Sequence, residues 1–235
     1  MRQEQEIIKD RLERLVGRMK ELGYNSSVVR LTKVVVNELQ QRGVYCVDRF
    51  IQKLLDRVNE REEYLDILME GRVGVILARN GFTEIYIEYR EPGPDLKGDY
   101  DEQTVYFEVT RRRPNEEDEL FLQPGAHWVE QTSTEAILGR IREKLGQLES
   151  GEINVVVYCS ETVAMGKPNV EEAFKYIRQE ISYDPKSYEK LSGVLFTESA
   201  EFPLTDIWEI CLFKNENALR PLDIRLTKKL ESLQK

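Results

Sequence analysis

Residues 94–113 read PDLKGDYDEQTVYFEVTRRR, and this stretch decides the fold. Its second half, TVYFEVT at 104–110, is rich in β-branched and aromatic residues and predicts a strand. Side chains alternate between the two faces of a strand, so apolar Phe107 and Val109 share one face. Glu108 and Thr110 share the other. The apolar face is expected to point to the core.

A second short strand, DLKG at 95–98, precedes this one, and the polar segment DYDEQ between them predicts a turn. If the two strands pair antiparallel, Asp95 and Lys97 share a face. The carboxylates of Asp95 and Glu108 then converge across the hairpin. Carboxylate oxygens are the ligands that Mg²⁺ or Mn²⁺ takes, with water or substrate phosphate filling the remaining positions. The hairpin therefore predicts a metal site at Asp95 and Glu108.

Apolar residues recur at helical spacing in three segments of the first 60 residues. A fourth helix is expected at about 62–79, followed by Gly81 at its C-terminal end. The strands of 83–110 come next, then a capped helix near 134–150 and a buried strand, INVVVYCS, at 153–160. Another helix, two strands and a short terminal helix complete the chain. This order predicts an α/β (α+β) fold with a mixed sheet flanked by helices, in two regions: a helical one at 1–60 and an α/β domain at 61–235.

Composition narrows the class of protein. The net charge is −9, but residues 1–60 hold 12 Lys/Arg and 9 Asp/Glu, a net of +3, which leaves −12 for the rest. The chain has no apolar run long enough to predict a membrane span, and we expect a cytoplasmic protein. The three cysteines are far apart and His127 is the single histidine, so cysteine zinc sites and histidine-based catalytic centres receive little weight.

The hairpin resembles the PD-(D/E)xK nuclease superfamily, whose restriction-endonuclease-like core has the order αβββαβ. Pro94-Asp95 matches the Pro-Asp element, and Glu108 matches the acid of the second element. Glu70, on the apolar face of the preceding helix, matches the helical acid. The resemblance implies a Mg²⁺- or Mn²⁺-dependent nuclease acting on DNA. It also implies that Asp95 and Glu108 bind the metal, with the Val109 carbonyl as a further ligand, and that Glu70 supports the site.

Thr110 stands where the superfamily has its lysine. A hydroxyl can bind water but carries no charge, so another cation is needed if the site is catalytic. Lys97 is expected to be the best substitute because it shares the predicted face of Asp95. Lys144 or Arg140, on the following helix, could also reach inward.

Other interpretations remain open. Asp95 alone is typical of a turn, and Glu108 alone of a solvated strand. The arginines 111–113 could contact nucleic-acid phosphates, or they could form a solvated strand end neutralised by the acidic residues after them. The helices of 1–60 could pack on the α/β core or mediate a homodimer. The function predicted first is a DNA nuclease, and the alternative is an inactive nuclease-fold module that binds nucleic acid or a protein.

Overall fold

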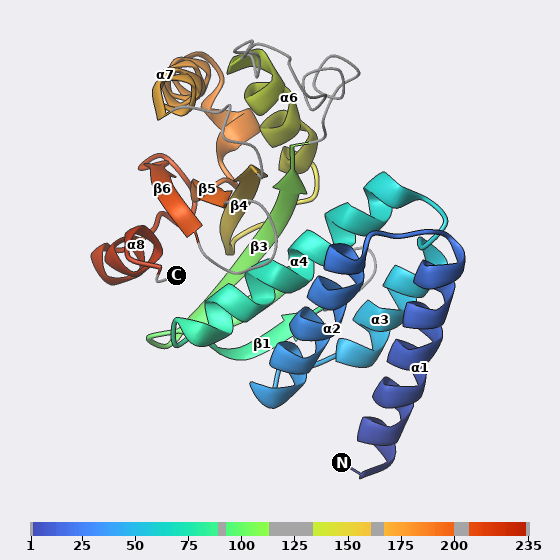
Figure 1. Cartoon of the computed structure of the whole chain (residues 1–235). Coiled ribbons are helices and arrows are strands. Elements are labelled where there is room, and N and C mark those ends of the chain that lie inside the picture. Colours follow the sequence, from blue (N-terminus) through green and yellow to red (C-terminus); the bar gives the residue numbers. More distant parts are fainter. Residues whose placement is uncertain (1, 89–92, 113–133, 161–166, 200–206, 234–235) are drawn as a thin grey trace, which may run out of the picture.

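In the computed structural model, a six-stranded mixed sheet forms the centre of the molecule (Figure 1). The structure describes residues 2–88, 93–112, 134–160, 167–199 and 207–233. The strands, in chain order and in the order in which they lie in the sheet, are β1 (Thr83–Ile87), β2 (Leu96–Tyr100), β3 (Gln103–Arg111), β4 (Ile153–Ser160), β5 (Gly193–Ser199) and β6 (Ile207–Lys214).

Seven α-helices surround the sheet in the described part of the chain. They are α1 (Arg2–Glu21), α2 (Ser26–Gln41), α3 (Val47–Asp56), α4 (Arg61–Arg79), α6 (Thr134–Leu145), α7 (Lys167–Tyr183) and α8 (Ile224–Glu231). From α4 to β4 the order is helix, three strands, helix, strand, as the sequence predicts. The α+β class and the mixed sheet are therefore confirmed.

The pairing of neighbouring strands changes twice across the sheet, from antiparallel to parallel and back. β1, β2 and β3 pair antiparallel, β3, β4 and β5 pair parallel, and β6 returns antiparallel to β5. The parallel pair β3–β4 needs a crossover, which contains α6. The crossover brings α6 over the end of the hairpin formed by β2 and β3.

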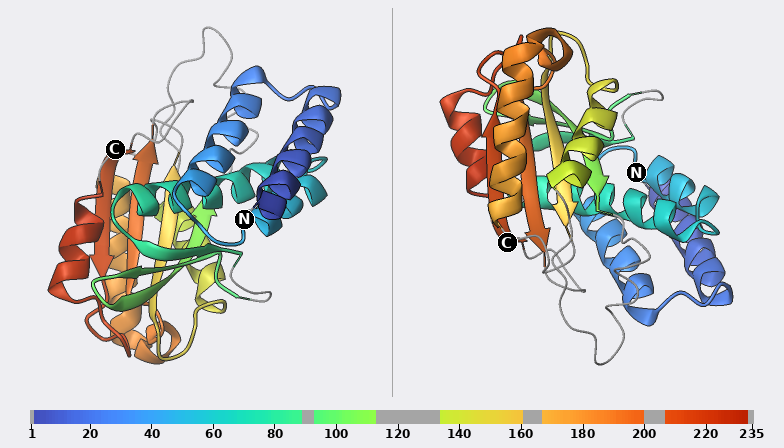
Figure 2. Two further views of the ribbon diagram at one scale, coloured as in Figure 1. Left: turned by 90° about the horizontal axis from the view of Figure 1, so that it is seen from below. Right: turned by 90° about the horizontal axis from the view of Figure 1, so that it is seen from above.

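The two faces of the sheet carry two separate hydrophobic clusters. Val155 and Val157 of β4 join the cluster shared with α1–α4 and α8, whereas Val156 and Tyr158 join the cluster under α6 and α7. Figure 2 shows α6 and α7 on the side of the sheet opposite the N-terminal helices. All eight residues of β4 are buried because both faces are covered, as its continuous apolar run predicts.

The N-terminal helices share their core with the sheet. Apolar residues of α1, α2 and α3 belong to the same cluster as α4 and the hairpin strands, so their apolar faces pack inside the chain. The chain between α2 and α3 also bridges to β1: Tyr45 N–H donates to Ile85 O (2.8 Å), and Ile87 N–H donates to Tyr45 O (3.2 Å). These contacts fix α3 beside the end of β1.

Gly71 allows α4 to approach α2 and α3 closely. A Cβ atom at this position would lie 2.4 Å from Phe50 Cζ of α3 and 2.8 Å from Val35 Cγ1 of α2. Both distances are too short for any side chain, so glycine is needed for this packing. The close approach places Glu70, the neighbouring residue on α4, next to α3.

One local expectation is wrong in detail. The predicted DYDEQ turn is shorter than expected, because Asp99 and Tyr100 belong to β2 and only Asp101 and Glu102 turn the chain. Both turn residues have positive φ (48° and 65°), as a two-residue primed hairpin turn requires.

Among the helices that the structure describes, none is both long enough and apolar enough to span a membrane.

Candidate functional site

The β2–β3 hairpin brings Asp95 beside Glu108. The register pairs Leu96 with Phe107, so Asp95, one residue before β2, lies opposite Glu108 of β3. The backbone N–H of Val109 donates a hydrogen bond to Asp95 Oδ2 at 2.8 Å. Val105, Phe107 and Val109 are buried toward α4, which leaves Glu108 on the α6 side. The predicted convergence of the two carboxylates is therefore present.

Lys144, near the end of α6, lies between these carboxylates. Its Nζ is 3.0 Å from Glu108 Oε2, 3.4 Å from Asp95 Oδ2 and 3.0 Å from Gln147 Oε1. The two carboxylate oxygens cannot be farther apart than the sum of their distances to Nζ, 6.4 Å. One ion with oxygen ligands at about 2.1 Å spans oxygens up to about 4.2 Å apart, so the two carboxylates must lie within this separation to share an ion.

Glu108 is deeply buried, with 2% of its side chain exposed. Burial and the negative charge of Asp95 raise the pKa of Glu108 to about 7, although the Lys144 ammonium opposes this shift. Among the described residues, no group donates a hydrogen bond to Glu108 Oε1. A buried carboxylate oxygen without a donor is costly, so Glu108 has capacity for one further cation or donor.

A second lysine lies between two further carboxylates. Lys53 Nζ of α3 is 3.0 Å from Glu70 Oε2 and 2.7 Å from Glu88 Oε1, just after β1. Glu70 is buried on α4, as its place on the apolar helix face predicts. Burial and the charge of Asp95 raise the pKa of Glu70 well above its usual value, with Lys53 opposing them.

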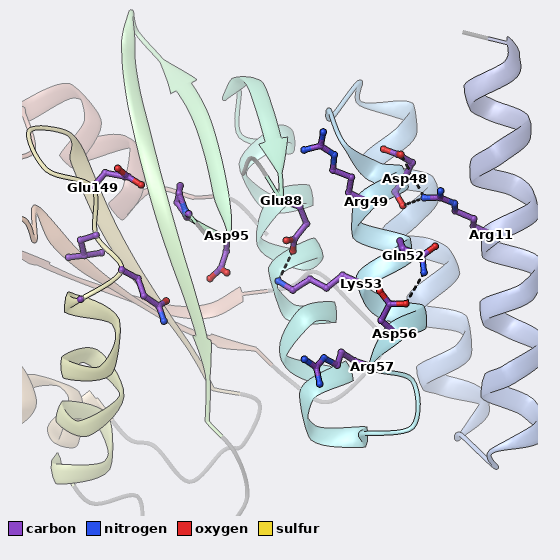
Figure 3. Close-up of a pocket in the computed structure, with 15 residues that line it drawn as sticks. Arg11, Asp48, Arg49, Gln52, Lys53, Asp56, Arg57, Glu88, Asp95 and Glu149 are labelled. Atoms are coloured by element: carbon purple, nitrogen blue, oxygen red, sulfur yellow. Dashed lines mark hydrogen bonds and ion pairs between the residues drawn. The ribbon is translucent and has the colours of Figure 1, made fainter. Parts of the chain in front are cut away.

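Asp95 connects the two lysine clusters. Burial lowers the pKa of Lys53 and of Lys144, but neighbouring carboxylates raise both. The negative charge of Asp95 contributes to both increases. Asp95 also lines a cleft of about 1170 Å³ between α3 and the chain that follows α6. Figure 3 shows Asp95 on one side of this cleft, with Lys53 reaching toward Glu88 from the other. The carboxylate of Asp95 is thus accessible from solvent-filled space.

The other residues predicted for the site lie elsewhere. Lys97 is placed over the ring of Tyr86, its Nζ 5.1 Å from the ring centroid, so Lys144 rather than Lys97 contacts the carboxylates. Thr110 is half-buried on the Glu108 face of β3 and pairs in register with Tyr158 of β4. Arg140 forms an ion pair with Glu143 on its own helix and does not reach the hairpin.

The arginines at the end of β3 do not form an exposed phosphate-binding cluster in the described residues. Arg111 is buried toward α4, where it forms ion pairs with Glu62 and with Asp66 (3.0 Å). Arg112 is buried as well, and its backbone N–H donates to Cys159 O. Arg113 lies outside the described residues. As placed, Arg111 and Arg112 neither face Glu108 together nor present their guanidinium groups to solvent.

Sequence reasoning missed Lys53 and Glu88. One signal pointed to such a partner: the helical neighbours of Glu70 at three and four positions are Ile67, Val73, Gly74 and Asp66, none of them a cation. A buried carboxylate without a cation on its own helix needs one from elsewhere. Nothing in the sequence shows that α3 supplies it.

Chemically, the hairpin offers two converging carboxylates and one ammonium group. In the described part of the chain, no group of three or more His, Cys, Asp or Glu side chains is arranged as a metal site. A metal at this position would therefore take two protein carboxylates, and its other ligands would come from backbone oxygen, water or substrate. No family model, curated protein or solved structure matches this chain.

Proposed function

We propose that this protein is a metal-dependent nuclease that hydrolyses DNA phosphodiester bonds at Asp95, Glu108 and Lys144. One observation carries the proposal: Asp95 and Glu108, on adjacent strands of one hairpin, both contact the ammonium of Lys144 from the following helix. The order α4, β1, β2, β3, α6, β4 supports a restriction-endonuclease-like core around this hairpin.

The residues present fit Mg²⁺ or Mn²⁺. Both carboxylates offer hard oxygen donors, and Glu108 Oε1 has no donor among the described residues. When bound, such an ion would polarise the phosphoryl oxygen and lower the pKa of a bound water, so that hydroxide could act as the nucleophile. The Val109 N–H donates to Asp95 Oδ2 and holds this carboxylate in place.

Lys144 supplies the positive charge that Thr110 lacks. Lys144 is flanked by Asp95 and Glu108, with 18% of its side chain exposed. Burial alone would lower its pKa, but the two carboxylates raise it, so its ammonium stays protonated. A protonated lysine can donate a hydrogen bond to the attacking water or to the phosphate, where it stabilises developing negative charge. The Thr110 hydroxyl, on the same face, can orient a water without changing the charge.

Glu70 supports the site indirectly in this proposal. It does not contact Lys144 but binds Lys53, and its negative charge adds to the acidic field around Asp95. Its function is to position α3 and Lys53 next to Asp95 rather than to contact the metal.

DNA cleavage by highly purified protein tests the proposal. We expect wild-type protein to nick or cut plasmid DNA with Mg²⁺ or Mn²⁺, and not with EDTA. Asp95→Asn and Glu108→Gln should each lower the rate by at least about 10²–10³-fold. Glu171→Gln, an exposed carboxylate on α7, is the matched control and should leave the rate unchanged. Full activity in both site variants would show that this site assignment is wrong.

A second function is favoured by the same lysine. The Lys144 ammonium already compensates both carboxylates, as it would in a purely structural ion pair. The chain could then be a nuclease-fold module that binds nucleic acid without cutting it. Absence of cleavage with Mg²⁺ and Mn²⁺, together with salt-dependent DNA binding, would favour this function over the first.

A further inference from the structure

The cleft beside Asp95 has a basic wall that the nuclease resemblance does not account for. Arg49, Lys53 and Arg57 follow one another at intervals of four residues along α3 and its C-terminal cap, so they share one helix face. The opposite face of α3 is buried in the core through Phe50, Ile51 and Leu54. Figure 3 shows the three basic side chains on the side of the cleft that faces Asp95.

The three cations differ in how firmly they are held. Lys53 is committed to Glu70 and Glu88. Arg57 pairs with Glu60 and Glu63, but all three side chains are more than 40% exposed, and such surface pairs contribute little. Arg49 is exposed and has no ion-pair partner among the described residues. Arg49 and Arg57 can therefore bind an external anion without breaking a buried interaction.

Charge is separated across the cleft. The wall from α1 and α3 carries four cations, Arg11 and the three of α3, against Asp48 and Asp56. The opposite wall, residues 146–149, contributes Glu149 as its charged residue, and Glu88 and Asp95 lie between the walls. A strand with a phosphate backbone would meet cations on one side while its scissile group lies near Asp95.

The size of the cleft also indicates a polymer. Its volume of about 1170 Å³ exceeds the roughly 300–1,000 Å³ of pockets that enclose small molecules. Residues 1–60, which build this wall, carry a net charge of +3, whereas the whole chain carries a net charge of −9. Local basic surfaces bind nucleic acid even when the whole chain is acidic.

We propose that the α3 wall binds the backbone of the DNA strand that passes Asp95, with Arg49 and Arg57 each contacting a phosphate. This inference rests on the proposed nuclease function and assigns its substrate-binding surface. It gives the N-terminal helices a role in holding substrate, in addition to packing on the core.

The salt dependence of DNA binding tests this surface. Binding of fluorescent duplex and single-stranded DNA is measured by anisotropy over a range of salt concentrations, with Ca²⁺, which takes oxygen ligands like Mg²⁺. Each lost phosphate contact should reduce the slope of log K against log salt by about 0.9 for duplex or 0.7 for a single strand. We expect Arg49→Gln and Arg57→Gln each to reduce the slope by this amount, and the double variant to reduce it by about twice this amount.

Arg30→Gln with Lys33→Gln is the matched control. These residues are exposed on α2, outside the cleft, and their replacement removes the same formal charge. Their slope should equal that of the wild type. A double α3 variant with wild-type slope and affinity, or wild-type protein that binds neither DNA, would overturn the inference.

The outcomes also separate this surface from the proposed reaction. If wild-type protein cleaves DNA and the α3 variants bind normally, the surface is wrong and the nuclease stands. If binding depends on Arg49 and Arg57 but no metal supports cleavage, the surface stands and the nuclease is wrong.

Discussion

Two lysines in this protein each lie between two carboxylates, and Asp95 lies close to both. Lys53 contacts Glu70 and Glu88 at 3.0 and 2.7 Å, and Lys144 contacts Glu108 and Asp95 at 3.0 and 3.4 Å. The groups are chemically alike. They differ in where their carboxylates come from and in what those carboxylates can still bind.

The carboxylates of the Lys53 cluster come from α4 and from the residue after β1, so this cluster joins α3 to α4 and to the end of β1. Those of the Lys144 cluster come from one hairpin and lie opposite each other, with Glu108 Oε1 lacking a donor among the described residues. The first cluster is a satisfied link between elements. The second has a buried carboxylate oxygen without a hydrogen-bond donor, and this difference in geometry is the reason for proposing it as the site.

The largest effect is expected at Lys144. Lys144→Ala should lower the rate of DNA cleavage by about 10²–10³-fold, because it removes the charge that stabilises the transition state. Lys144→Arg should recover part of the rate. Lys97→Ala, whose lysine lies over Tyr86, serves as the matched control and should change the rate by no more than a few-fold. If Lys97→Ala were the inactive variant, the assignment of the cation would be reversed.

The next largest effect is expected on the pH dependence of stability, through Glu108. Burial and Asp95 raise the pKa of Glu108 to about 7, so the folded chain holds this proton more tightly than the unfolded chain. The resulting stability is complete below about pH 4.3 and is lost as the pH rises through 7. In EDTA, chemical denaturation from pH 5 to 8 should show the wild type losing up to about 3 kcal/mol more than Glu108→Gln. Parallel curves for the two proteins would contradict the raised pKa.

A smaller effect is expected at Lys53, on stability. Lys53→Met leaves Glu70 buried without its cation, and we expect a loss of about 1–3 kcal/mol in the free energy of unfolding. The loss is limited because Lys53 is 36% exposed and Glu70 can take up a proton. In a double-mutant cycle, adding Glu70→Gln should recover part of the loss. Strict additivity would show that the pair contributes no coupling.

Periodicity made the hairpin half of the site predictable. Alternation along β3 is a local property, so the sequence places Glu108 and Thr110 on one face. Antiparallel pairing of the hairpin then places Asp95 across from Glu108. By the same alternation Arg111 lies on the face opposite Glu108, where it forms ion pairs with Glu62 and Asp66. Its pairing with α4 was not predictable, because it depends on how the helix packs across the sheet.

Cations were harder to assign for the same reason. Lys97 is close to Asp95 in sequence, yet its side chain turns to Tyr86, whereas Lys144 comes from 49 positions away through the crossover. Lys53 arrives from a helix whose approach depends on the missing side chain of Gly71. Long-range packing of this kind leaves little trace in a single sequence.

Metal binding tests the central claim most directly, namely that the Lys144 cluster and not the Lys53 cluster is the metal site. Calorimetric titration with Mn²⁺ compares wild-type protein with two matched carboxyl-to-amide variants, Asp95→Asn and Glu88→Gln. We predict that wild-type protein and Glu88→Gln bind Mn²⁺ with similar affinity and that Asp95→Asn loses this binding. Loss in Glu88→Gln with retention in Asp95→Asn, or no binding by the wild type, would contradict the account.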